Sequence, residues 1–216
     1  LSVEDSRRGE TRYSYTPTGQ LERAEYPDGR VQWRKSDQTG NLYPDPDMKL
    51  RRYLGGGRLE QDGEWHCEYD ADGNLTERYL GTGRWLDGKK DRWRYRWNAD
   101  GSLAKVVRPD KREVEFTYDA LGRRLSKSFG TTVTRWVWNG NVPLHQWKQH
   151  REYSVMEDRW NTDTERRNMT VWLFDEESFV PVAMLKEGRS YSILTDQLGT
   201  PTEAYDAEGN EVWSRV

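Results

Sequence analysis

The sequence predicts an all-β protein, an extended and curved antiparallel sheet of stacked hairpins. Apolar or aromatic residues occupy every second position in many short runs, which places one row of side chains on one face of a strand. Asp-Gly and Asn-Gly pairs separate these runs, and such pairs supply the positive φ angles of tight hairpin turns. Long stretches with the helical spacing of apolar residues are absent from the sequence.

The alternating runs are spread along the chain. The clearest are Thr11–Tyr15, Arg92–Trp97, Val114–Tyr118 and Thr134–Trp138. Trp, Tyr, Val, Phe and Thr pack well on a pleated surface. We therefore expect a strand at each of these positions.

The apolar content of the chain is mainly aromatic. Leu, Ile, Val and Phe make up only about 17% of the 216 residues, whereas there are 11 Trp and 12 Tyr. So low an aliphatic content is typical of disordered chains. A net charge of only −3 and the large area that each aromatic ring can bury favour a folded protein instead.

Composition also excludes several functional classes. No apolar run approaches the roughly 20 residues of a membrane span, and the mean hydropathy is −1.12. The balanced charge gives no reason to expect nucleic acid as a main partner. A single cysteine, Cys67, excludes an internal disulfide and a multi-cysteine zinc site.

One motif recurs along the chain: an aromatic residue, usually followed by Asp, Asn or Thr, then Gly four positions after the aromatic, then an apolar residue. Copies begin at Tyr15, Tyr53, Tyr69, Trp97, Tyr118 and Tyr205, with a degenerate copy at Ser36. We expect the aromatic to end one strand and pack inward, the Asp to bond its own turn, and the Gly to adopt positive φ. Stacked hairpins can bury a continuous face that one hairpin cannot. The alternative is an ordinary β-meander with Asx-Gly turns.

A second element lies between the copies. It reads Tyr-Pro-Asp-Gly-Arg-Val at residues 26–31 and Arg-Pro-Asp-Lys-Arg-Glu-Val at residues 108–114.

These motifs resemble the YD repeats of the Rhs proteins. Tyr69-Asp70 with Gly73, and Tyr118-Asp119 with Gly122, match the repeat closely. The stretch 172–183 and the run Asp196-Gln197-Leu198-Gly199-Thr200-Pro201 are similar to the end of the Rhs core, where the family usually has His at the position of Gln197. The structural motif residues predicted on this basis are Tyr69, Asp70, Gly73, Tyr118, Asp119, Gly122, Asp196, Leu198, Gly199 and Pro201.

The resemblance implies a function. Rhs proteins are large bacterial polymorphic toxins whose YD repeats form a hollow shell around a C-terminal toxin domain, and the distantly related teneurins use a similar shell in cell adhesion. By this resemblance the chain is a shell segment in bacterial competition. Its expected partners are the rest of the shell, the enclosed toxin and, through regions outside this sequence, secretion-spike and chaperone proteins. It would reside in the bacterial cytoplasm before export, for example by type VI secretion, and then be secreted or delivered.

The resemblance also implies an organisation. We expect a YD-repeat array at residues 1–130 and a core segment at residues 131–216, in one continuous sheet. A start at Leu1 rather than Met indicates a fragment of a larger protein. The family closes its core at an autoproteolytic Asp-Pro-x-Gly motif, whereas the only Asp-Pro here, Asp45-Pro46, lacks the Gly. We therefore expect neither the autoproteolytic site nor the toxin in this sequence.

No residue set predicts catalysis, a cofactor or a metal. Residues 83–89 match the start of a phosphate-binding loop, but Lys90 stands where Ser or Thr is required. His145 and His150 are five apart and fall on opposite faces of a strand, and the adjacent His66 and Cys67 do so as well. The prediction is a non-enzymatic protein without cofactors.

Two features leave alternatives open. Residues 151–168 carry mixed charges without Gly or Pro, and fit a solvated strand extension, a short helix or a disordered loop, with partner docking as a sharper interpretation. The many aromatic residues suit the lining of a shell. Exposed on a surface, they would instead bind carbohydrate or a receptor, which is the alternative function.

Overall fold

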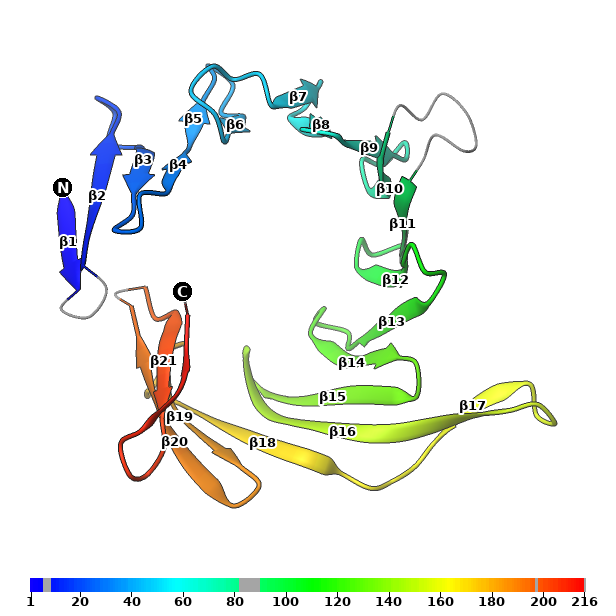
Figure 1. The fold of residues 1–216 in the computed structure, drawn as a ribbon. Helices are drawn as coiled ribbons and strands as arrows, with labels where there is room; N and C mark the ends of the chain where they lie inside the picture. Colours follow the sequence, from blue (N-terminus) through cyan, green and yellow to red (C-terminus); the bar gives the residue numbers. More distant parts are fainter. Residues whose placement is uncertain (6–8, 82–89, 197, 216) are drawn as a thin grey trace. The chain divides into compact units, whose positions relative to one another are not determined.

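The computed structural model describes residues 1–5, 9–81, 90–196 and 198–215 (Figure 1). Within these residues the chain forms 22 strands and no helix. The strands are β1 (Ser2–Asp5), β2 (Gly9–Tyr15), β3 (Leu21–Glu25), β4 (Val31–Trp33), β5 (Lys35–Ser36), β6 (Leu42–Tyr43), β7 (Arg51–Leu54), β8 (Arg58–Asp62), β9 (Trp65–Tyr69), β10 (Leu75–Leu80), β11 (Lys90–Trp97), β12 (Leu103–Val107), β13 (Glu113–Tyr118), β14 (Arg124–Phe129), β15 (Thr132–Asn139), β16 (Val142–Ser154), β17 (Arg159–Thr162), β18 (Arg167–Phe174), β19 (Pro181–Lys186), β20 (Arg189–Thr195), β21 (Pro201–Tyr205) and β22 (Glu211–Ser214).

Most strands pair with their neighbours in sequence. Strands β1–β4 form one sheet, β5 pairs with β6, and a 16-stranded sheet contains β7–β22, with β17 paired to β16 beside the main path. The 16-stranded sheet ends at β7 and β22 and is therefore open. The predicted all-β antiparallel fold is confirmed, and the four predicted strands correspond to β2, β11, β13 and β15.

The chain divides into two compact units, Leu1–Tyr95 and Arg96–Val216. The first holds the β1–β4 sheet, the β5–β6 pair and strands β7–β10. The second holds β12–β22. The division predicted at residue 130 rests on sequence motifs and stays a prediction.

The buried core is thin. Among the described residues the buried hydrophobic side chains are Ala24, Tyr79, Val106, Val107, Val133, Trp147, Ile193 and Ala204, and no large side chain is fully buried. Arginine side chains cover many of the aromatic rings instead. Arg78 lies 4.3 Å from the Trp65 ring centroid, and Arg124 lies 4.7 Å from that of Phe116. Such contacts let a single sheet layer protect aromatic faces without a second apolar layer.

Residues 151–168 form a strand extension, one of the three structures predicted for them. Strand β16 continues beyond its pairing with β18 and pairs with β17 over Arg151–Ser154. The resulting hairpin extends away from the neighbouring strands (Figure 1).

Two sequence predictions lie outside the described residues. They are the phosphate-loop resemblance at 83–89 and the departure at Gln197. Within the described part of the chain, no helix is long and apolar enough to cross a membrane.

Candidate functional site

The recurring motif forms one hydrogen-bonded turn. At Asp70, the backbone N–H donates to the Asn74 carbonyl at 3.0 Å, and the Gly73 N–H donates back to the Asp70 carbonyl at 3.2 Å. The Asp70 carboxylate accepts the Asn74 N–H at 2.8 Å. Asp119 repeats this pattern with Gly122 and Arg123, and its carboxylate also pairs with the Arg123 guanidinium at 2.7 Å.

The Asp196 turn has the same geometry. The Asp196 carboxylate accepts the N–H groups of Leu198 and Thr200, each at 2.9 Å. The Leu198 side chain is 82% exposed, and Pro201 begins β21. Gly199 has φ +78°, and a Cβ at this position would lie 2.8 Å from Val180 Cγ2. This turn therefore packs against the β18–β19 connection, a contact that the sequence did not predict.

The second element forms this turn as well. The N–H of Tyr26 donates to the Arg30 carbonyl at 2.9 Å, and Arg108 donates to Arg112 at the same distance. Lys111 occupies the position that Gly holds elsewhere, with φ +65°. The two motifs seen in the sequence are thus one structural unit with different side chains.

The copy at Tyr53 differs. Leu54 pairs directly with Arg58, so Gly55–Gly57 form a tighter hairpin between β7 and β8. Gly56 and Gly57 both have positive φ.

Tyrosine hydroxyls connect successive repeats. The Tyr69 hydroxyl donates to the Leu59 carbonyl at 2.8 Å, and the Tyr118 hydroxyl to the Leu103 carbonyl at 3.0 Å. In both cases the acceptor is the apolar residue of the preceding copy. Tyr53 donates to the Leu42 carbonyl in the same way. Sequence reasoning missed these bonds, and the preference for Tyr over Phe in the motif was the signal that could have indicated them.

Hydrogen bonds to the turn carboxylates lower their pKa values. For Asp70, Asp119 and Asp196 the largest cause is a backbone N–H donated four residues later, from Asn74, Arg123 and Thr200 respectively. Hydrogen bonds from the side chains of Asn41 and Thr39, and from their backbone N–H groups, lower the pKa of Asp37 to about 2. The ionised carboxylate is therefore the form that holds the turn.

A charged cluster links β12, β13 and β16. Glu115 lies 3.1 Å from the Lys105 ammonium and 3.3 Å from the Arg151 guanidinium. Arg151 is only 7% exposed, and its guanidinium also donates to the Gly130 carbonyl at 2.8 Å. Burial opposes ionisation of Glu115, but bonds from Lys105 and Arg151 outweigh it and lower its pKa.

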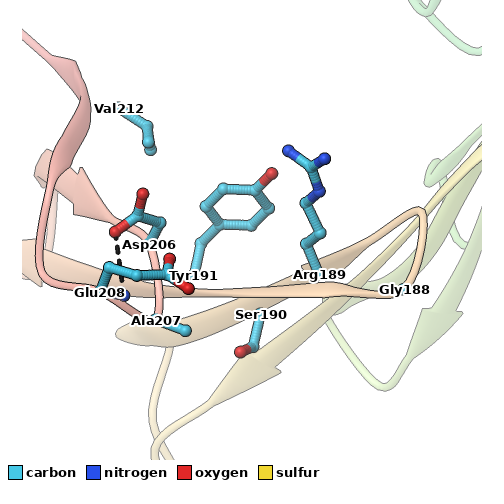
Figure 2. Close-up of a pocket in the computed structure, with 8 residues that line it drawn as sticks. All are labelled: Gly188, Arg189, Ser190, Tyr191, Asp206, Ala207, Glu208 and Val212. Carbon is cyan, nitrogen blue, oxygen red and sulfur yellow. Dashed lines mark hydrogen bonds between the residues drawn. The ribbon is translucent and has the colours of Figure 1, made fainter.

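A hollow of about 540 Å³ lies beside β20 and the β21–β22 turn, and Figure 2 shows the residues that line it. The Tyr191 ring stands beside the Arg189 guanidinium, with the carboxylate of Asp206 on the other side of the ring (Figure 2). Asp206 already accepts the N–H groups of Glu208 and Asn210. Arg189, Tyr191 and Glu208 are the lining groups that could contact a polar molecule here.

Two of the residues considered for catalysis or metal binding, His66 and Cys67, lie in β9. Burial raises the pKa of the Cys67 thiol, which disfavours a reactive thiolate. His66 stacks on Tyr79 with ring centroids 5.6 Å apart. Among the described residues, no group of three His, Cys, Asp or Glu side chains could hold a metal ion.

The antiparallel hairpins, the repeated Asp-Gly turn and the Tyr bridges together define a YD-repeat shell protein. The chain belongs to the family described as Teneurin YD-shell, whose model matches residues 1–215.

Its curated relatives include Rhs proteins and a toxin. Double-stranded DNA deaminase toxin A of Burkholderia cenocepacia (strain H111) is 32% identical over 154 residues, which are 65% of this chain and 10% of that protein. Probable deoxyribonuclease RhsB of Dickeya dadantii (strain 3937) is 30% identical over 87 residues, 39% of this chain and 6% of that protein. The chain therefore spans a tenth or less of the length of these relatives.

Solved structures with similarity belong to Tc toxins. The Photorhabdus luminescens Tc holotoxin pore has a TM-score of 0.45 at 14% identity, covering 95% of this chain and 9% of that chain. The TcdB2-TccC3 structure has a TM-score of 0.40 at 15% identity, and the similarity covers 94% of this chain and 10% of that chain.

Proposed function

We propose that this chain is a segment of the wall of a shell that encloses a toxic polypeptide. The observation that carries the proposal is the match of residues 1–215 to the YD-shell family, in a chain with 32% identity to a curated toxin. The mechanism is steric: a wall of hydrogen-bonded antiparallel strands keeps the enclosed polypeptide away from the producing cell. The segment itself performs no catalysis and needs no cofactor.

The proposal gives the motif residues a structural role. Asp70, Asp119 and Asp196 hold the turns through their carboxylates, while Tyr69 and Tyr118 fasten each hairpin to the preceding repeat. Gly73, Gly122 and Gly199 allow the positive φ angles, and Leu198 and Pro201 complete the last turn. Each bond joins nearest neighbours, as expected for a repeat array.

The same proposal covers the organisation and setting of the parent protein. Residues 1–130 would be the repeat array and residues 131–216 a core segment near the C-terminal end of the Rhs core. The partners would be the rest of the shell and the enclosed toxin. The parent would remain in the bacterial cytoplasm until export, for example by type VI secretion, and would act on competing bacteria.

The test is protease protection of the native parent protein from its source cell. Size-exclusion chromatography, with the intact mass of each peak and fragment measured, should place these residues in a particle above about 100 kDa. That particle should shield a second polypeptide from added protease. Introducing Gly122→Val into the parent should expose that polypeptide, because a β-branched residue cannot adopt φ +76° without strain. Leu121→Ala, at a 74% exposed position of the same turn, is the matched control and should leave protection intact. A free 25.6 kDa species with nothing enclosed would contradict the proposal.

A second candidate function is surface recognition of carbohydrate, favoured by the hollow of Figure 2. Tyr191 offers a ring for stacking, and Arg189 and Glu208 offer hydrogen bonds to hydroxyl groups. Saturable binding on a glycan array that Tyr191→Ala abolishes would support this function, and an array without binding would reject it.

A further inference from the structure

The end of the β16–β17 hairpin projects beyond the strands on either side of β16. Strand β15 pairs with β16 no further than His150, and β18 pairs with it no further than Lys148. Beyond these residues, β17 is the partner of β16 among the described strands. We call residues 152–161 the arm, and it extends from the sheet as a two-stranded ribbon (Figure 1).

The ladder of strand pairing is interrupted where the arm begins. Four residues, 163–166, separate β17 from β18 along one edge of β16, where β16 itself has only Gln149 and His150. Asp163 closes part of this gap, because its N–H donates to the His150 carbonyl at 2.9 Å and its carboxylate accepts the His150 N–H at 3.1 Å. Such a bulge disrupts the ladder and bends a strand. The base of the arm is therefore the place where the hairpin can change direction.

Arg151 connects the arm to the rest of the sheet. Its buried guanidinium donates to the Gly130 carbonyl in the β14–β15 turn at 2.8 Å and lies 3.3 Å from the Glu115 carboxylate on β13. The same guanidinium lies 4.3 Å from the centroid of the Trp160 ring on β17. A cation is attracted to the face of an indole ring. One side chain therefore contacts the sheet and the arm at the same time.

The arm also has contacts of its own. The rings of Tyr153 and Trp160 meet edge to face with centroids 5.5 Å apart, and the Tyr153 hydroxyl bonds the Asp158 carboxylate. The Arg159 guanidinium donates to the Glu157 carboxylate at 3.1 Å. Each of these contacts joins two residues of the arm. They can therefore persist when the arm changes its direction relative to the sheet.

We propose that the arm bends as a unit about its base, and that the contact between Arg151 and Trp160 latches it in the direction that it has in this structure. In the released state, Arg151 keeps its bonds to Gly130 and Glu115, and the Trp160 ring moves away from the guanidinium. Elements that open locally have few contacts with the rest of the fold, and they pivot at a few residues where regular structure ends. The proposal concerns this hairpin alone and is independent of whether a shell encloses a toxin.

The test is the distance between two spin labels in the 216-residue chain, measured by pulsed electron resonance. One label is attached at Met156→Cys on the arm, at a 98% exposed position, and the other at Leu121→Cys in the β13–β14 turn, at a 74% exposed position. A Cys67→Ser background removes the native thiol. The latched protein should give one main distance between the labels.

Two pairs of variants isolate the latch. Arg151→Met should raise the population at other distances about fivefold, the effect of losing a partly exposed cation–π contact. Arg159→Met is its matched control, because the Arg159 guanidinium pairs with Glu157 inside the arm, and it should leave the distances unchanged. Trp160→Leu removes both the Arg151 contact and the Tyr153 contact, whereas Tyr153→Leu removes the ring contact and leaves the latch. The distances should therefore spread in Trp160→Leu and not in Tyr153→Leu, a comparison that also serves if Arg151→Met does not fold.

Amide hydrogen exchange over residues 152–161 separates bending of the arm from its unfolding. The amides of the arm should keep their protection in Arg151→Met, and Trp160→Leu should keep as much protection as Tyr153→Leu, because the hydrogen bonds within the arm persist. Distances that stay unchanged in both Arg151→Met and Trp160→Leu overturn the proposal. Loss of arm protection together with the spread of distances also overturns it, because the arm would then unfold rather than bend.

Discussion

Replacing Gly199 by Ala should destabilise the protein more than the same change at Gly122. Both glycines have nearly equal φ, +78° and +76°, so the left-handed backbone costs Ala about 1–2 kcal/mol at each position. A Cβ at Gly122 meets nothing within 4 Å, whereas a Cβ at Gly199 lies 2.8 Å from Val180 Cγ2. Val has a stiff χ1, so the backbone must shift, at a further cost of about 1–3 kcal/mol.

The assay is urea unfolding followed by tryptophan fluorescence. We expect Gly122→Ala to lower the free energy of unfolding by about 1–2 kcal/mol and Gly199→Ala by about 2–5 kcal/mol. Val180→Ala removes Cγ2, so in that background Gly199→Ala should cost no more than Gly122→Ala, giving a favourable coupling of about 1–3 kcal/mol. Equal losses at the two glycines, or no relief from Val180→Ala, would refute the steric argument.

Three further predictions concern the turns and their bridges. Tyr118→Phe should lower the free energy of unfolding by about 1 kcal/mol because it leaves the Leu103 carbonyl without its donor. The control is Tyr15→Phe, at a 45% exposed position in the first copy of the motif, which should have little effect. Equal losses of stability in the two variants would argue against the Tyr118 bridge. Lys111→Gly should raise the thermal midpoint and increase the free energy of unfolding by about 1 kcal/mol, because φ +65° suits Gly. Unchanged or lower stability would show that contacts of the Lys side chain offset the cost of the positive φ. Asp37 has a folded-state pKa of about 2, below an unfolded value of about 3.9, so its contribution is complete above pH of about 4 and lost as pH falls towards 2. Asp37→Asn should therefore flatten acid unfolding in that window, and an unchanged pH profile would contradict the assignment.

The turns could be predicted because their bonds are local. The Asp carboxylate, the Gly and the N–H groups they arrange lie within five residues, so the composition of a short segment determines the geometry. The sequence patterns nevertheless indicated that the Pro-Asp elements at 26–31 and 108–114 were a different structural element from the YD turns. The structure shows one turn, because the backbone bonds are the same whether the carboxylate stands at the first position or the third.

The aromatic residues of the motif were predicted to pack inward, but in the structure their side chains are only partly buried. Tyr69 and Tyr118 are half-buried, and Tyr15 is 45% exposed. A single sheet layer offers no second surface to cover them completely. Arginine side chains and neighbouring hairpins cover them instead, and composition alone does not reveal which arginine faces which ring.

By itself the sequence determined the all-β class, the principal strands, the repeat and the family, because each depends on two-residue alternation or on residues adjacent in the chain. Only the tertiary structure decided which strands face each other beyond the hairpins. The Tyr118–Leu103 bond spans 15 residues and the Arg151–Glu115 pair spans 36. The contact of Gly199 with Val180 likewise depends on how β18–β21 align. Such contacts follow from strand register, and a shift of one residue would move every side chain to the opposite face.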